Sequence, residues 1–127
     1  MNILRTALVT LLLSLPILAQ QAPTASDASV VTADATASVY LTVNNPTMYD
    51  IYEMSATSDA AGKVELLSGD KPVESMTVAA YGSLTLKSGG MFLRLLDLKR
   101  ALKAGDKVTV TMVTDGGIEI TATATVK

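Results

Sequence analysis

The chain has 127 residues, of which 49% are hydrophobic, and it contains no cysteine, histidine or tryptophan. The lack of thiol and imidazole groups excludes Ser-His and Cys-His nucleophile pairs and the commonest transition-metal ligands, so we do not expect an enzyme. Ten basic and twelve acidic residues give a net charge of −2, which is not the basic footprint of a protein that binds nucleic acid.

Residues 1–19 have the pattern of an export signal. Arg5 precedes an apolar run over residues 8–18, and Ala19 is the small residue expected before a signal-peptidase cut. The run is about half the length of a membrane-spanning helix, which argues against an anchor. No cysteine follows it for lipoprotein attachment. We expect cleavage after Ala19, export to the periplasm, cell envelope or extracellular space, and a mature chain without a membrane span.

The mature part is expected to be one β-domain over residues 29–127, after a flexible leader of small and polar residues over 20–28. Alternation of apolar and polar residues predicts a strand over 37–43. Turn signals separate five more predicted strands, over residues 51–57, 64–67, 74–78, 84–87 and 91–96. Leucines at helical spacing over 96–104 are limited to a single turn by Gly105.

The last two strands have the clearest pattern. Residues 107–112 and 118–126 both alternate, and the turn signal Asp115-Gly116-Gly117 lies between them, which predicts an antiparallel hairpin. The spacing of turn signals along the domain predicts an all-β fold, a sandwich or barrel of antiparallel strands.

Several stretches resemble the periplasmic copper chaperone family PCu(A)C. They are residues 40–45, 64–67, 75–76, 89–99 and 102–106, in matching order over nearly the whole mature domain. The most specific is Gly89-Gly90 before a strand, followed by Leu98-Lys99 and then by Leu-Lys-Ala-Gly-Asp at 102–106. The resemblance implies an antiparallel Greek-key β-sandwich of the cupredoxin-like type. It also implies Cu(I) handling or delivery to the copper sites of respiratory oxidases.

The resemblance places four copper ligands at Leu67, Met76, Phe92 and Arg94 of this sequence. The family has His or Met at the first position, Met at the second, and a His-x-Met pair at the last two. Residues two apart in a strand share a face, and imidazole and thioether donors select Cu(I). Leu67 and Phe92 have no donor atom, and Arg94 carries a fixed positive charge. We therefore expect no cofactor, or weak Cu(I) only.

Met76 is the one remaining ligand in register, although methionine is more often core filler than ligand. A weak all-methionine site would use Met76 with Met48, Met54 or Met91 as helpers. The alternative function is a non-metal protein-binding or structural module of the cell envelope, with Phe92 and Arg94 as interaction residues. We expect a monomer whose partner is a copper-accepting or other envelope protein. If Phe92 and Arg94 are instead structural, Phe92 packs and Arg94 forms an ion pair.

The other charged clusters are expected to be solvated surface. The acidic sets lack the oxygen spacing of a calcium loop, and the basic set is expected to balance nearby acidic residues. These sets are Asp50, Glu53 and Asp59; Asp70 and Glu74; and Lys99, Arg100, Lys103 and Lys107 beside Asp97 and Asp106.

Overall fold

The computed structural model describes residues 22–127, so the expected export signal over residues 1–19 lies outside the described residues. The described part is built from strands, with no helix assigned to it. Consequently, it contains no helix long and apolar enough to cross a membrane. The strands are β1 (Thr24–Ala33), β2 (Thr36–Asn44), β3 (Ile51–Ser58), β4 (Ala61–Ser68), β5 (Lys71–Pro72), β6 (Met76–Val78), β7 (Ser83–Thr85), β8 (Met91–Leu98), β9 (Lys107–Thr114) and β10 (Glu119–Val126).

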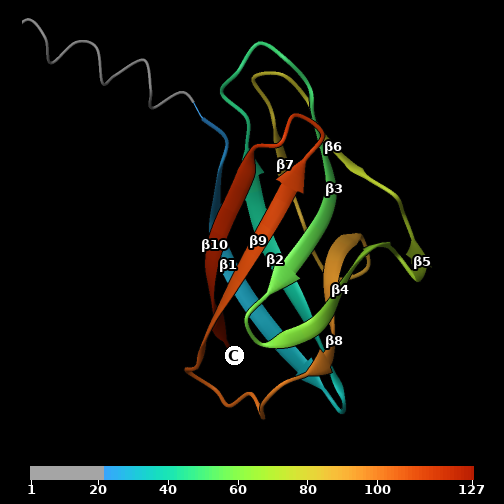
Figure 1. The fold of residues 1–127 in the computed structure, drawn as a ribbon, viewed down its shortest axis with the longest axis vertical. Helices are drawn as coiled ribbons and strands as arrows, with labels where there is room; N and C mark the ends of the chain where they lie inside the picture. Colours follow the sequence, from blue (N-terminus) through green and yellow to red (C-terminus); the bar gives the residue numbers. More distant parts are fainter. Residues whose placement is uncertain (1–21) are drawn as a thin grey trace, which may run out of the picture.

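The strands close into a barrel (Figure 1). Its order is β4-β8-β2-β1-β10-β9-β3, and β3 pairs back to β4, while β5, β6 and β7 add to the edges. β1 and β10 run parallel, so the barrel is mixed. The all-β prediction is confirmed, but the expectation of an entirely antiparallel arrangement is wrong. The first and last barrel strands run in the same direction, and pairing them leaves neither with an open edge.

Part of the flexible leader expected over residues 20–28 belongs to a strand, while residues 20–21 lie outside the described residues. β1 begins at Thr24 and pairs antiparallel with β2, from Thr24 opposite Asn44 to the turn before Thr36. Val30 is the one buried side chain of this strand. Backbone pairing with β2, joined by β10 at Ser29 and Val30, therefore orders this strand, although its side chains give little hydrophobic signal.

The other strands follow the predicted pattern closely. The hairpin is confirmed, with β9 and β10 in antiparallel register. The strands predicted over 37–43, 51–57, 64–67 and 91–96 lie within β2, β3, β4 and β8. Those predicted over 74–78 and 84–87 shrink to the short β6 and β7. After β8 the chain runs to β9 without a helical turn, and Gly105 takes a positive φ of 94° in that connection.

Alternating side chains of the strands fill the barrel interior. β2 contributes Ala37, Val39, Leu41 and Val43, all at most 2% exposed. β8 contributes Leu93 and Leu95 to the same cluster. Each fully buried aliphatic side chain of this kind contributes about 1.5–3 kcal/mol relative to an exposed one. This alternation leaves the opposite faces of β4 and β8 outside the core.

Candidate functional site on the outer face of β4 and β8

Strand pairing brings three of the four predicted ligand positions together. Leu67 of β4 lies directly opposite Phe92 of β8, and Arg94 lies two residues further along β8. Their neighbours Leu66 and Leu93 belong to the core cluster. Because successive side chains of a strand point to opposite faces, the three residues share the outer face.

This outer face carries a small packed cluster of its own. Leu67 is 1% exposed and Phe92 is 7% exposed, yet neither belongs to the core cluster inside the barrel. The ring of Tyr40 packs against Phe92, with 6.1 Å between ring centroids and an interplanar angle of 52°. Pro72 of β5 is the register partner of Leu67 on the other side of β4. Leu67 and Phe92, two of the positions at which the resemblance places copper ligands, are therefore packed apolar side chains.

Arg94 completes this cluster through an aromatic contact. Its guanidinium carbon lies 5.5 Å from the centroid of the Phe92 ring, within the range of a cation–π interaction. Its register partners are Glu65 on β4 and Ser38 on β2. Within residues 22–127 the one salt bridge joins Arg100 and Asp59 at 3.9 Å. Arg94 therefore contacts the Phe92 ring, and among residues 22–127 it does not form the ion pair that the structural interpretation of the sequence predicted.

The methionines occupy different settings. Met76, on β6, is 1% exposed and belongs to the core cluster. Met48 is 63% exposed in the loop before β3, and Met54 is 49% exposed on β3. Met91 is half-buried and packs against the core, away from the face of Phe92. The structure thus shows Met76 inside the barrel, while Leu67, Phe92 and Arg94 lie on its outer face.

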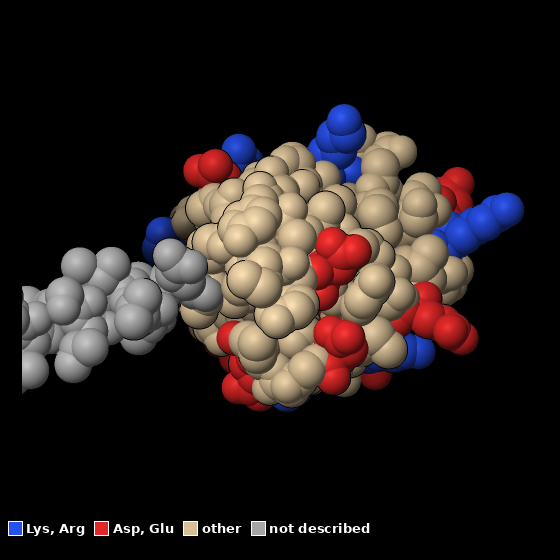
Figure 2. All heavy atoms as spheres, turned by 90° about the horizontal axis from the view of Figure 1, so that it is seen from above, with Lys and Arg blue, Asp and Glu red and all other residues tan. Residues whose placement is uncertain are grey.

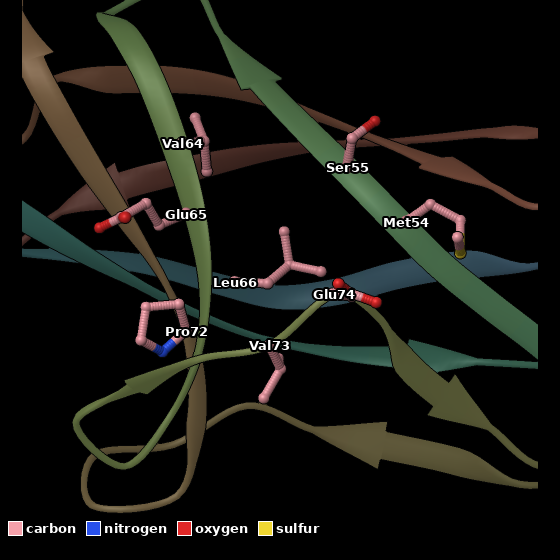
Figure 3. Close-up of a pocket in the computed structure, with 8 residues that line it drawn as sticks. All are labelled: Met54, Ser55, Val64, Glu65, Leu66, Pro72, Val73 and Glu74. Carbon is pink, nitrogen blue, oxygen red and sulfur yellow. The ribbon is translucent and has the colours of Figure 1, made fainter.

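A shallow groove lies beside this face, where β3 and β4 separate (Figure 3). Its lining residues are Met54, Ser55, Val64, Glu65, Leu66, Pro72, Val73 and Glu74. Met54 comes from β3, on the side opposite β4, and it is the one thioether of the groove. One soft donor beside carboxylates does not make a Cu(I) site. No group of three histidine, cysteine or acidic residues in the part that the structure describes is placed to hold a metal.

Sequence reasoning missed Tyr40 and misjudged Glu53. Tyr40 lies on the polar side of the predicted strand 37–43, and an aromatic residue at such a position was the available signal. Glu53 was expected to be solvated, but it is 1% exposed. Neither of its carboxylate oxygens has a hydrogen-bond partner within the described chain. Burial raises the pKa of Glu53 from its ordinary 4.5 to about 7.

The fold resembles three solved structures, two of which have copper bound. The copper-bound PCuAC domain from PmoF2 has a TM-score of 0.73 and 17% identity, covering 81% of this chain and 90% of that chain. The apo PCuAC domain from PmoF1 has a TM-score of 0.72 and 19% identity, covering 81% and 91%. The solution structure of Cu(I)-bound DR1885 from Deinococcus radiodurans has a TM-score of 0.68 and 28% identity, covering 83% and 76%.

The sequence itself matches one family model, described as "Putative lipoprotein LpqE-like", over residues 18–126. Comparison with curated proteins gives no match. A lipoprotein family is an exported family, although this chain has no cysteine to carry a lipid. The match over most of the chain shows that the chain belongs to the LpqE-like family, and its fold is shared with the PCuAC domains.

Proposed function

We propose that this protein is an exported, non-catalytic, protein-binding module of the cell envelope, built on the PCuAC scaffold without a tight Cu(I) site. One observation carries the proposal. The Arg94 guanidinium lies 5.5 Å from the Phe92 ring centroid, at the two positions where the resemblance places a His-x-Met pair. These side chains contact each other and offer no electron pair to a soft metal ion.

Electrostatics supports the same conclusion. Two positive charges about 4 Å apart repel by about 1 kcal/mol in water and about 4 kcal/mol near a protein surface. A Cu(I) ion placed beside Arg94 would meet this repulsion in addition to the missing donors at Leu67 and Phe92. Tight binding on this face therefore requires changes at all three positions.

Weak copper handling is the second candidate function. It is favoured by the copper-bound relatives PmoF2 and DR1885, and it would take the form of Cu(I) handling or delivery to respiratory oxidase sites. Its donors would come from elsewhere on the surface. Met48 and Met54 are the exposed thioethers of the described chain, and each would need a partner ligand to hold Cu(I).

Anaerobic titration with Cu(I) against a competing chelator separates the two functions. We expect protein purified from the cell envelope to leave the copper on the chelator. The triple variant Leu67→His, Phe92→His, Arg94→Met should remove one equivalent, because two imidazoles and one thioether then share one face. An unmodified protein that competes as well as the triple variant would contradict the proposal.

Met76 provides a matched control for this titration. Adding Met76→Leu to the triple variant conserves side-chain volume in the core. We expect the restored copper affinity to stay the same, because Met76 lies among the core residues. A large loss of affinity would instead assign Met76 to the site.

A further inference from the structure

Exposed apolar side chains gather at one end of the barrel. We call this the loop end. It consists of residues 45–50 between β2 and β3, residues 79–82 between β6 and β7, and residues 115–118 between β9 and β10 (Figure 1). Four of the seven exposed large hydrophobic residues of the described chain lie on these loops: Met48 (63% exposed), Tyr49 (71%), Tyr81 (73%) and Ile118 (47%).

Hydrogen bonds tie two of these loops into one platform. The side-chain amide of Asn45 donates to the carbonyl oxygens of Tyr49, Val78 and Ala79, at 2.7, 3.1 and 3.2 Å. The Tyr81 amide donates to the Thr47 carbonyl at 3.0 Å. The exposed rings of Tyr49 and Tyr81 therefore belong to loops whose backbone is ordered by hydrogen bonds. An ordered surface loses little conformational entropy when a partner binds.

Tyr81 has a strained backbone. Its φ is 57°, in the left-handed region that glycine adopts without cost and other residues avoid. The strain brings no burial in return, because the Tyr81 side chain is 73% exposed. Residues held in such strained conformations cluster at active sites and ligand clamps. Exposed tyrosines are also frequent anchors of protein interfaces.

The charge of the loop end favours one class of partner. The three loops contain Asp50 and Asp115 but no lysine or arginine. Viewed from this end, the surface shows a broad uncharged area with acidic side chains beside it and basic side chains at the rim of the view (Figure 2). Acidic residues repel anionic lipid headgroups, which attract basic segments. We propose that the loop end is a preformed docking surface for a protein that presents an apolar centre bordered by lysine or arginine.

Site-specific crosslinking in cells tests this proposal. A photoreactive phenylalanine analogue replaces Tyr81 in the full chain. The matched control carries it at Val31, which is 43% exposed on β1 near the opposite end of the barrel. We expect one protein adduct from position 81 that is absent from position 31. Failure to form a protein adduct, or an adduct with lipid, would overturn the proposal.

The identified protein is then purified and its affinity measured directly. Tyr81→Gly should lower the affinity about tenfold or more, while the melting temperature stays unchanged or rises because glycine relieves the strain. Val31→Ala should leave the affinity unchanged, and higher ionic strength should weaken binding. Unchanged affinity of Tyr81→Gly overturns the proposal. Tyr81-dependent binding to phosphatidylglycerol or phosphatidylcholine vesicles, without a protein partner, also overturns it by assigning the surface to a membrane.

This inference rests on the proposed function, because it requires a partner protein. The two fail in different experiments. Tight Cu(I) binding by the unmodified chain would contradict the proposed function. It would not change the effect of the Tyr81 variants on the affinity for a partner protein. If the partner binds the Tyr81→Gly variant with unchanged affinity, the loop end is not the docking surface, but the protein-binding function still stands.

Discussion

Asn45 and Glu53 are buried to the same extent, at 1% exposure each, but their surroundings are opposite. Asn45 donates to three carbonyl oxygens and accepts from the Thr47 amide and hydroxyl, at 3.0 and 2.6 Å. Neither carboxylate oxygen of Glu53 has a hydrogen-bond partner among residues 22–127. A buried polar group stabilises a fold only where its hydrogen bonds are made. The first residue therefore holds two loops together, while the second destabilises the barrel whenever it is ionised.

Glu53 lies directly before an irregularity of β3. Ile51 and Glu53 face inward by regular alternation, and the next buried residue of the strand is Ala56, three positions later. A register shift against β9 between Glu53 and Ser55 accounts for this spacing. Glu53 is thus held at a core position by the strand, opposite Met76 on β6 and Thr114 on β9.

Removing the Asn45 side chain should have the largest effect. Asn45→Ala leaves one buried and two partly buried backbone carbonyls without this donor, which we expect to lower the free energy of unfolding by about 2–4 kcal/mol. Urea denaturation measures the change. Asn44→Ala is the matched control, because Asn44 is the preceding residue and its side chain is exposed. The stability of this variant should stay within about 0.5 kcal/mol of that of the parent. Equal stability of the two variants would contradict the role of Asn45.

The stability of the protein should fall as the pH rises from about 4.5 to about 7. In this window the unfolded chain ionises Glu53, while burial, which raises the pKa to about 7, keeps the folded chain protonated. The folded state then binds more protons than the unfolded state, so the free energy of unfolding decreases with pH, by about 3 kcal/mol in total. Below pH 4.5 both states are protonated and this contribution is constant.

Glu53→Leu isolates this contribution in the same denaturation experiment. The variant removes the titrating group and places an apolar side chain in the core. Its stability should lack the parent's decrease between pH 4.5 and 7, and it should exceed that of the parent at pH 7. A parallel decrease in both proteins would show that another group causes it.

Arg94 extends the comparison of Asn45 and Glu53 to a charged group that is only half-buried. Its contact with the Phe92 ring is expected to contribute about 0.5–1 kcal/mol. Arg94→Ala should lower the free energy of unfolding by that amount, with Lys99→Ala, an exposed position, as the control. A loss of several kcal/mol would mean that Arg94 neutralises a buried group. The contrast with Asn45 would then disappear.

Sequence alternation was sufficient for the strands whose side chains follow it. β2, β9 and β10 could be predicted in this way, as could the shared face of Leu67, Phe92 and Arg94, because period two determines that face. Alternation does not indicate which strands pair with each other. The contact of Tyr40 with Phe92 depends on β2 lying beside β8, which is a tertiary pairing.

The remaining differences have the same physical origin. β1 has few apolar residues and is ordered by backbone pairing to both neighbours. The charged side chain of Glu53 predicts a surface position, and no sequence pattern marks the register shift beside it. Met76 fits both a ligand and a core role in sequence, and the short strand β6 places it inside.

The parallel contact of β1 with β10 also has a consequence for the order of folding. Ser29 and Val30 pair with Thr125 and Val126, and the Lys127 amide donates to the Val30 carbonyl at 2.9 Å. The two ends of the domain therefore meet across nearly the whole length of the chain. Such distant pairing makes folding slow, in the range of milliseconds to seconds for β-proteins of this topology. No partly folded chain that lacks β10 can close the ring, so β1 and β9 keep open edges until the last strand arrives.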